Sequence, residues 1–319
     1  MLALVPTDGR DPLVRLDEVP EPKPAADEAL IEVDAFSINR GETFLLERPR
    51  PGWRPGKDIA GRVVQAAGDR SGPVVGSPVV GHAPEAGWAQ LSALPTESLA
   101  VLPAAVEPIT AAALPLAGLT ALRLLRVAGE LDGRRVLVTG ASGGVGHYVT
   151  ELASAAGAEV TVVTATRERA HRLLSLGAVG AVDDVDDASG PFDLVLESVG
   201  GTSLPRALAR MRKGGSLIWL GQASRQPVEL DFFAYFEQTS ATIRHFHYED
   251  STIPVSRDLE TLVRLVQTGR LHPELGLVAN WTKTATALQQ LRDRKLRGNA
   301  VLCVPTEPTI ERTHHESAD

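Results

Sequence analysis

Hydrophobic and polar residues follow two different patterns along this chain, and the pattern changes near residue 109. Before that point, short apolar runs lie between prolines and glycines, at residues 29–33, 59–64 and 74–80. Runs of this length, bounded by turn-forming residues, predict short and strongly bent β-strands. Alanine, leucine and arginine then dominate residues 109–127, which are interrupted only by one proline and one glycine, and this stretch predicts helix.

Beyond Gly133, segments of strand character alternate with segments of helical character. The predicted strands cover residues 135–139, 159–164, 179–182, 192–197 and 216–220. The predicted helices cover residues 145–156, 168–176 and 204–211. Strands that alternate with helices form a parallel sheet with helices on both of its faces. The sequence therefore predicts an α/β fold with a doubly wound, Rossmann-type parallel sheet.

Two more helices and a last strand follow, at residues 258–269, 285–293 and 301–304. The last segment is short and apolar, as is typical of a strand added to the sheet of the first domain. We therefore predict a nucleotide-binding domain at residues 117–251, inserted in a discontinuous β-rich domain made of residues 1–116 and 252–319. The active site is expected in the cleft between them, beyond the carboxyl ends of the parallel strands.

One glycine-rich turn carries the clearest chemical signal of the chain. Residues 136–146 read VLVTGASGGVG, so that an apolar strand passes through a turn directly into a helix. Gly140, Gly143 and Gly146 allow a sharp turn and a close approach of the backbone to a ligand. The first turn of the helix offers unpaired N–H groups and the positive end of its dipole to a phosphate. This combination predicts a dinucleotide-binding site.

Composition excludes several classes of function. The chain has 319 residues, 43% of them apolar, with a net charge of −8, and it has no basic cluster that would suit a nucleic acid. Cys303 is its only cysteine, so no disulfide can form within the chain. Acidic residues and prolines near the start are unlike a signal peptide, and no apolar run is long enough for a membrane span. We expect a soluble, cytoplasmic protein with a frayed tail at residues 306–319.

Four stretches together carry a family resemblance. They are residues 36–39 (FSIN) with Glu42, residues 55–61 (PGKDIAG), residues 114–121 (LPLAGLTA), and the glycine turn with the helix that leads to Gly157. Residues 192–201 and 297–302 support them. In this order they resemble the medium-chain dehydrogenase/reductase superfamily, in particular its zinc-independent quinone oxidoreductase and enoyl reductase branch, over about residues 1–304. The resemblance implies a GroES-like catalytic domain around the Rossmann domain.

The resemblance also implies roles for individual residues. It places Asn39 and Thr120 beside the nicotinamide and its ribose, although without the resemblance Asn39 could simply cap a turn and Thr120 a helix. The other implied cofactor contacts hold the pyrophosphate or line the cofactor path, and they are Ser142, Gly143, Gly144, Val145, Val199, Gly200 and Gly221. Members of this branch are commonly homodimers, and residues 242–247 alternate like an edge strand that could pair two subunits.

No metal is expected. Zinc-dependent members of the superfamily place a cysteine and a His-Glu pair where this chain has Asn39 and Lys57-Asp58. A catalytic zinc needs about three N, S or carboxylate ligands directed at one point, and the histidines here lack ligand spacing. His245 and His247 are interpreted as a surface or pocket pair. Without a Lewis acid, hydride transfer to the β-carbon of a conjugated carbonyl remains feasible, because hydrogen bonds can stabilise the enolate.

The residues after the second parallel strand indicate NADPH rather than NADH. An NAD-selective site has an acidic residue there that binds the ribose 2′-hydroxyl. This chain has Thr164, Thr166 and Arg167 instead, and the arginine offers a bidentate cation for a 2′-phosphate. The alternative is that Arg167 is only a solvated residue in the first turn of a helix.

The proton donor is not defined by the resemblance. Quinone oxidoreductases of this type often carry a tyrosine where this chain has Phe44, which cannot donate a proton. The candidate donors are Tyr148, His147, Tyr235, His82 and His245, or else solvent. We take Asn39 and Tyr148 as candidate catalytic residues, and Phe44, Tyr235 and His82 as candidate substrate contacts. The aromatic segment 231–236 is either a wall of the pocket, which would favour a bulky apolar substrate, or a core or dimer contact.

Three functions are compatible with these residues. The first is an NADPH-dependent, zinc-independent reductase of an α,β-unsaturated carbonyl compound, either a quinone or an enoyl substrate. The second is a pathway-specific natural-product reductase that acts on an imine, an iminium or an enone. The third is a non-catalytic NADPH-binding protein. Turnover of quinones, enones and cyclic imines would distinguish them.

Overall fold

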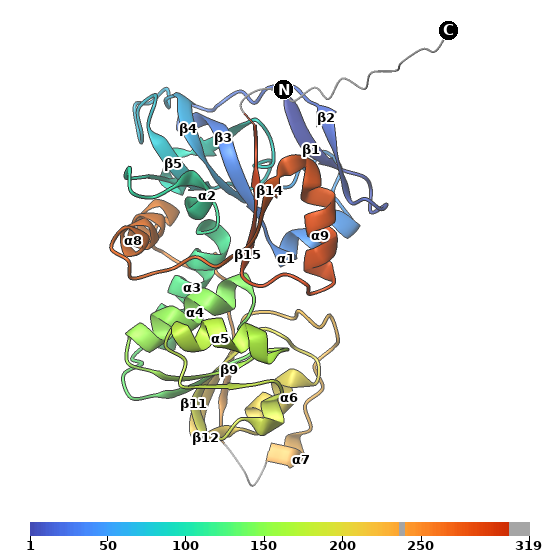
Figure 1. Cartoon of the computed structure of the whole chain (residues 1–319), viewed down its shortest axis with the longest axis vertical. Coiled ribbons are helices and arrows are strands. Elements are labelled where there is room, and N and C mark those ends of the chain that lie inside the picture. Colours follow the sequence, from blue (N-terminus) through green and yellow to red (C-terminus); the bar gives the residue numbers. More distant parts are fainter. Residues whose placement is uncertain (236–239, 306–319) are drawn as a thin grey trace.

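The computed structural model describes residues 1–235 and 240–305 and consists of two lobes stacked along the long axis. The upper lobe in Figure 1 is rich in strands and is built from both ends of the chain, whereas the lower lobe contains the middle of the chain. Helices α3 (Pro115–Ala128) and α4 (Gly144–Ala155) pack together at the centre, where the two lobes meet. The middle of the chain is therefore an insertion between two parts of the upper lobe.

The lower lobe contains the predicted doubly wound sheet. Its six parallel strands lie in the order β10 (Gly180–Val182), β9 (Glu159–Val163), β8 (Arg135–Val138), β11 (Phe192–Glu197), β12 (Met211–Trp219) and β13 (Thr242–His245). Helices α4, α5 (Arg167–Ser175) and α6 (Ser203–Leu208) belong to this lobe. The strand order reverses between β8 and β11, which is the switch point of a Rossmann fold.

One strand of this sheet starts earlier than its sequence predicts. Residues up to 211 were expected in a helix and the strand from 216, but α6 ends at Leu208 and β12 begins at Met211. Met211 pairs with Phe192, and the register then shifts before Ser216 pairs with Leu194. The two glycines within this irregularity hide the strand pattern, since a bulge breaks the alternation of side chains.

The upper lobe contains a seven-stranded sheet and a separate hairpin. The main path runs β14 (Leu275–Asn280), β15 (Asn299–Cys303), β3 (Glu28–Ile38), β4 (Asp58–Gln65), β5 (Pro78–His82) and β7 (Leu99–Val101), with β6 (Leu91–Pro95) also on β3. The hairpin is β1 (Leu2–Pro6) with β2 (Val14–Glu18). The predicted last strand does join the first sheet, because β15 pairs antiparallel with β3. The adjacent β14 was not predicted.

The helices of the upper lobe position the site. They are α1 (Arg40–Glu47), α2 (Pro108–Ala111), α8 (Val255–Gln267) and α9 (Thr284–Arg292). Short 3₁₀ turns lie at Thr96–Ser98 and Trp281–Lys283, and another lies in the lower lobe at Val185–Asp187. The predicted helical stretch 109–127 is split, because Pro115 starts a new helix at its first position. A Cβ on Gly118 would lie 2.9 Å from Leu262, so the glycine allows α3 and α8 to pack closely.

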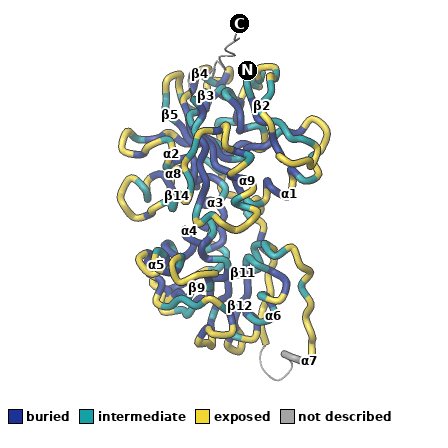
Figure 2. The backbone as a smooth tube through the Cα atoms, turned by 45° about the vertical axis from the view of Figure 1, so that its right-hand side comes forward, coloured by how far each residue is buried: buried dark blue, intermediate teal, exposed yellow. Residues whose placement is uncertain are grey.

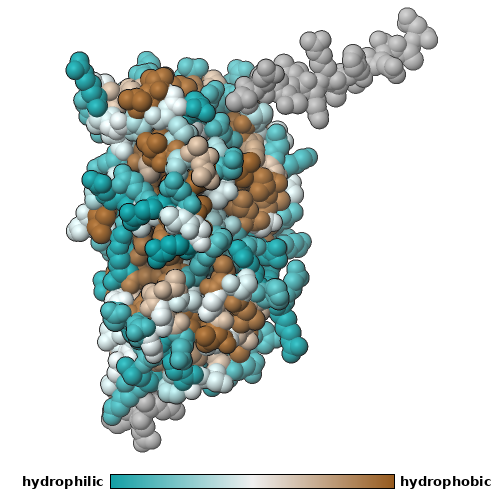
Figure 3. Space-filling view, turned by 60° about the vertical axis from the view of Figure 1, so that its left-hand side comes forward, coloured by the Kyte–Doolittle hydropathy of each residue, from teal (hydrophilic) through white to brown (hydrophobic). Residues whose placement is uncertain are grey.

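Burial follows the two sheets and the central helices. In Figure 2 the dark-blue, buried part of the tube runs through both sheets and along α3 and α4. One hydrophobic cluster contains residues of both lobes, among them Ala60, Val80, Leu119 and Leu196. Hydrophobic residues on the face shown in Figure 3 form separate clusters between hydrophilic ones. Within the described ranges, no helix is both long and apolar enough to cross a bilayer.

Candidate active site

The glycine turn lies between β8 and α4 and has the geometry of a phosphate cradle. Gly140 has a φ of +62°, and a Cβ there would lie 2.4 Å from the Ser198 hydroxyl. A Cβ on Gly146 would lie 2.4–2.6 Å from backbone atoms of Ala141, so no side chain fits at this position. The first N–H groups of α4 have no partner within the helix and point toward the turn. An anion is therefore favoured here.

The residues after β9 can hold a second phosphate. Thr164 is buried, and its hydroxyl has no hydrogen-bond partner among the described residues. Thr166 caps α5 by accepting from the N–H of Arg169 at 3.3 Å. Arg167 is exposed at the start of α5, and no side-chain hydrogen bond or ion pair joins it to another described residue. An unpaired hydroxyl and an available guanidinium fit the phosphate-bearing ribose of a dinucleotide.

Two further loops at the carboxyl ends of β11 and β12 are held by a buried carboxylate. Glu197 accepts hydrogen bonds from Thr139 Oγ1 at 3.0 Å and from the N–H groups of Val199 at 3.0 Å and Gly200 at 2.9 Å. Burial raises the pKa of Glu197 above its ordinary value. A Cβ on Gly221 would lie 3.0 Å from the Ser198 carbonyl oxygen, so the two loops touch. The predicted residues Val199, Gly200 and Gly221 therefore lie together at the edge of the sheet.

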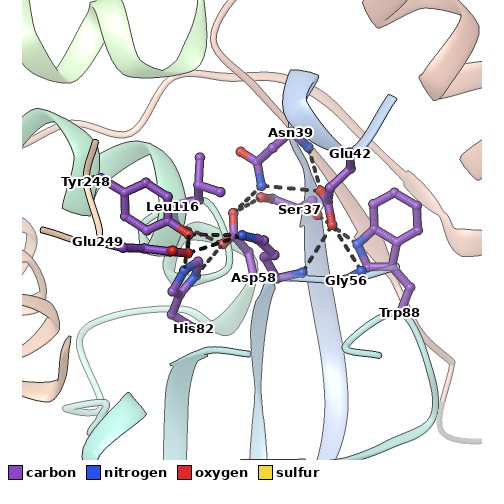
Figure 4. A network of polar contacts seen from close by, with 11 residues as sticks. Ser37, Asn39, Glu42, Gly56, Asp58, His82, Trp88, Leu116, Tyr248 and Glu249 are labelled. Atoms are coloured by element: carbon purple, nitrogen blue, oxygen red, sulfur yellow. Dashed lines mark hydrogen bonds and ion pairs between the residues drawn. The ribbon is translucent and has the colours of Figure 1, made fainter. Parts of the chain in front are cut away.

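The upper lobe faces this edge with a network of polar residues centred on Asp58 (Figure 4). The carboxylate is fully buried and lies at the start of β4. Its Oδ2 accepts from Ser37 Oγ at 2.6 Å and Asn39 Nδ2 at 2.7 Å, and its Oδ1 accepts from the N–H of Leu116 at 2.9 Å. Asp58 thus joins β3, β4 and the first turn of α3.

A second buried carboxylate lies beside the first. Glu42 accepts from the N–H groups of Asn39 at 2.9 Å, Gly56 at 3.0 Å and Lys57 at 3.1 Å. Burial and the nearby charge of Asp58 raise the pKa of Glu42 to about 8, against the opposing effect of these donors. Asn39 is the N-cap residue of α1, and its side chain also donates to Asp58. It therefore caps a turn, as the local alternative expects, and belongs to the polar network as well.

From Asp58 the network continues to the surface of a pocket. His82 Nδ1 lies 3.3 Å from Asp58 Oδ1, and its Nε2 lies 3.1 Å from the Tyr248 hydroxyl. Lys57 Nζ donates to the same hydroxyl at 3.0 Å, and this hydroxyl donates to Glu249 at 2.7 Å. All four of these outer side chains line a pocket of about 430 Å³. Tyr248 comes from the segment that follows β13, so the pocket includes residues from both halves of the chain.

The two halves of the site meet through the first turn of α3. A Cβ on Gly144 would lie 3.6 Å from Ala117, while the preceding Leu116 donates to Asp58. Gly298 also donates to the Ser142 carbonyl at 2.9 Å, which joins the glycine turn to the upper lobe. Thr120 is buried one turn further along α3. It lies inside the helix, so the alternative that it caps a helix is wrong.

The structure does not place the candidate donors of α4 at the pocket. Tyr148 is fully buried and donates to the Ala113 carbonyl at 3.0 Å, and burial holds its pKa well above the ordinary value. His147 is 1% exposed, its Nδ1 lies 3.0 Å from the Gly143 carbonyl, and burial lowers its pKa. These surroundings are those of structural residues, because α4 packs this face against the core. We therefore assign neither of them a catalytic role.

Other candidates lie elsewhere. Phe44 is 36% exposed beneath the guanidinium of Arg225, 5.0 Å from its ring centre. In the aromatic segment, Phe232 and Phe233 are 70% and 80% exposed in α7 (Phe232–Tyr235), at the end of the lower lobe remote from the upper one (Figure 1), so they line no described pocket. The side chain of Tyr235 lies outside the described residues. His245 is exposed on β13.

Sequence reasoning missed Tyr248. The available signal was its place directly after the predicted edge strand, where residues at the carboxyl end of a parallel strand face the cleft. Its partner His82 is 166 residues away in the sequence. In the described residues, no group of three His, Cys, Asp or Glu side chains is placed to hold a metal ion.

Comparison with known proteins agrees with this architecture. Residues 144–268 match the family model described as zinc-binding dehydrogenase. A mycobacterial protein solved in complex with NADPH is similar at 26% identity and a TM-score of 0.87, over 95% of this chain and all of that one. The chain therefore resembles the medium-chain dehydrogenase/reductase superfamily, in sequence over residues 144–268 and in fold over most of its length. The matched range 144–268 excludes Asn39, Lys57 and Asp58, so the match carries no information on zinc ligands in this chain.

Two curated relatives extend the comparison. The chain is 38% identical over 167 residues to the chloroplast envelope quinone oxidoreductase homolog of Arabidopsis thaliana, an alignment that covers 47% of this chain and 50% of that protein. It is 22% identical over 324 residues to acryloyl-coenzyme A reductase of Sulfurisphaera tokodaii, covering 90% and 96%. The chain therefore resembles the quinone oxidoreductase branch of the superfamily.

Proposed function

We propose that this protein is an NADPH-dependent, zinc-independent reductase that transfers hydride to an α,β-unsaturated carbonyl compound. One observation carries the proposal: a phosphate cradle with an available arginine lies on one side of the lobe junction, and a hydrogen-bonding pocket lies on the other. Names of similar proteins support it, since they include a quinone oxidoreductase homolog and an acryloyl-coenzyme A reductase. A similar solved structure holds NADPH.

The cofactor would be held by the residues that fit it. Gly140, Ser142, Gly143, Gly144, Val145 and Gly146 would surround the pyrophosphate, and Thr164, Thr166 and Arg167 the 2′-phosphate. Val199, Gly200 and Gly221 would line its path toward Asn39 and Thr120. When bound, the reduced nicotinamide supplies a hydride. Lys57 can donate a hydrogen bond to a substrate oxygen in the pocket, which stabilises negative charge that develops there.

The lining of the pocket indicates the kind of substrate. Lysine, histidine, tyrosine, glutamate and serine side chains lie there beside prolines, and the volume is about 430 Å³. This mixture favours a compact conjugated carbonyl compound with polar groups, rather than the bulky apolar substrate that an aromatic wall would favour. The donor set at residues 39, 57 and 58, an amide, an ammonium and a carboxylate, is unsuited to a catalytic zinc.

Cofactor oxidation against a panel of quinones, enones and cyclic imines tests this function. We expect NADPH consumption with small enones or quinones and a lower kcat/KM with NADH. Turnover of cyclic imines alone would favour the natural-product reductase. Tight binding of NADPH with no turnover on any of them would favour a non-catalytic role.

We also propose that the protein is a homodimer that pairs through β13. All four residues of this strand are exposed, and β13 is the last strand on its side of the sheet. An unpaired edge is a template for a second copy of the same strand. A cytoplasmic location stays a prediction.

A further inference from the structure

We propose that Tyr248 is the proton donor of the reduction, and that the buried Asp58–His82 pair positions its hydroxyl and returns its proton. This inference rests on the proposed function, because it concerns the protonation that completes hydride transfer to a conjugated carbonyl. It assigns the acid that neither the glycine-turn helix nor Phe44 supplies. Its basis is the junction of charged and polar groups around a single hydroxyl at the pocket (Figure 4).

The Tyr248 hydroxyl lies where three side chains converge. Lys57 Nζ is 3.0 Å away, His82 Nε2 is 3.1 Å away and Glu249 Oε1 is 2.7 Å away. Behind it, the imidazole of His82 bridges to the fully buried Asp58. A carboxylate that holds one ring nitrogen directs the other toward its partner, and here that partner is the phenol. The result is a continuous path from a buried carboxylate to the pocket.

The charges around Tyr248 keep its phenol protonated until an enolate forms in the pocket. Burial and the neighbouring Glu249 hold the pKa of Tyr248 above its ordinary value, so the group is protonated at neutral pH. The Lys57 ammonium touches the same oxygen and stabilises the phenolate that forms when the proton leaves. The proton is therefore released only to a strong base such as a carbanion-like enolate.

The step balances within these groups. After hydride has added to the β-carbon, the electron pair of the C=C bond lies on the enolate. Its α-carbon forms a bond to the proton of Tyr248 as the O–H bond breaks. The phenolate then takes the Nε2 proton of His82, which keeps its Nδ1–H toward Asp58, and solvent in the pocket restores the Nε2 proton. The sum is one hydride and one proton added across the double bond.

The groups that face Tyr248 come from four elements and govern the pH dependence. They are Lys57 directly before β4, Asp58 at the start of β4, His82 on β5, and Arg123 on α3, which donates to the Tyr248 carbonyl at 2.8 Å. The neighbouring His247 and Glu249 complete the set. Since the path to Tyr248 runs through these groups, Tyr248→Phe should change the pH profile of kcat.

Kinetics on the complete protein provide the first test. We expect Tyr248→Phe to lower kcat by about 10²-fold, as is typical on loss of a general acid, with little change in KM or in NADPH affinity measured by fluorescence. The solvent deuterium isotope effect on kcat should rise, because protonation then comes from water. His82→Ala should also lose kcat and regain part of it with added imidazole, which can enter the pocket. His171→Asn, on the exposed face of α5, is the matched control.

A cofactor-free measurement provides the second test. 4-Nitrophenolate is an oxyanion that resembles an enolate, and it should bind the cofactor-free protein beside Lys57 and Tyr248. Titration should show that Tyr248→Phe binds it about 10-fold more weakly, which is the loss expected for one hydrogen bond to a charged group. If Tyr248→Phe keeps wild-type kcat and pH profile while NADPH is consumed, this inference is overturned and the proposed function stands. If the wild type reduces no enone or quinone, the proposed function fails. In that case the binding measurement still tests the inference, which is overturned if Tyr248→Phe binds 4-nitrophenolate as tightly as the wild type.

Discussion

At the scale of single residues, the site consists of two buried carboxylates and the donors that surround them. Asp58 has its four hydrogen-bonding partners in place, including His82. Glu42 lies beside it and accepts from three N–H groups. Two adjacent buried negative charges are costly, so one of the two carboxyls is protonated more easily than an ordinary carboxylic acid.

The raised pKa of Glu42 should appear in the pH dependence of stability. Its folded pKa of about 8 exceeds the unfolded value, so the folded state holds a proton that the unfolded state loses between about pH 4.5 and 8. The free energy of unfolding should therefore decrease as pH rises through this window, by about 1.4 kcal/mol per unit from this group. Urea denaturation at a series of pH values measures the slope.

Glu42→Gln is the variant for that experiment. Its amide can accept at one oxygen only, so we expect a loss of about 1–3 kcal/mol at low pH where the wild type is most stable. The contribution of this group to the pH slope should disappear. A slope equal to that of the wild type would contradict the assignment of the titration to Glu42.

The cofactor preference depends on a single exposed side chain. Arg167→Ala removes the guanidinium that would pair with the 2′-phosphate, so kcat/KM for NADPH should fall by about 10–100-fold, the equivalent of one charge-assisted interaction. The value for NADH should change little. Arg257→Ala, a surface arginine paired with Glu260 on α8, serves as the control. Equal losses for both cofactors would show that Arg167 does not read the phosphate.

At the scale of elements, the glycine turn could be predicted from the sequence and the proton path could not. The turn is local, since a strand, four glycines and a helix lie within residues 135–156, and steric limits dictate their conformation. The path joins Asp58, His82 and Tyr248 from β4, β5 and the segment after β13, and only the tertiary fold brings them together. The same reason explains why Tyr148 does not line the pocket, because its helix was predicted correctly but the face that it buries was not.

Glycine substitutions test the packing of the turn. Gly146→Ala places a Cβ within 2.4–2.6 Å of the Ala141 backbone, so we expect a loss of at least 2 kcal/mol in stability, about the size of a severe packing clash, together with loss of NADPH binding. Gly41→Ala on α1 meets no atom within 4 Å and has helical geometry, so it should be neutral or slightly stabilising. Thermal unfolding and cofactor titration of the two variants measure the difference.

Tyr148 contributes to the contact between α4 and the segment before α3. Its hydroxyl donates to the Ala113 carbonyl, so Tyr148→Phe should lower the free energy of unfolding by about 1–2 kcal/mol, because a buried acceptor loses its donor. Denaturant unfolding measures this change. A fall in kcat comparable to that of Tyr248→Phe would instead restore Tyr148 as a candidate donor.

At the scale of the whole molecule, pairs of charged residues join the two lobes beside the cofactor path. Arg225 of the lower lobe forms a bidentate ion pair with Glu47 of α1, at 2.7 and 2.6 Å, and its guanidinium lies over Phe44. On another side, Glu274 binds both Arg172 at 2.8 Å and Arg297 at 3.0 Å. The two carboxylates are mostly shielded from solvent and their arginine partners are more exposed, and the pairs fasten the lower lobe to α1 and to the segment before β14.

The proposed dimer belongs to this scale as well. Ile243 is 42% exposed in the middle of β13, and pairing of two copies would bury it. We expect Ile243→Glu to convert a dimer into a monomer in light scattering at micromolar concentration, since pairing would then bring two carboxylates, one from each copy, to the edge where Ile243 is buried. A monomeric wild type under the same conditions would reject the proposal.

The position of β15 has a consequence for how the protein is made. This strand lies inside the upper sheet, between β14 and β3, yet it ends at Cys303 near the end of the chain. On the ribosome, the lower lobe has all of its strands by residue 245, whereas the upper sheet must wait for the last strand. Until then residues 35–38 of β3 have no partner on that edge. The newly made upper lobe should therefore be the part that chaperones protect and that premature termination destroys.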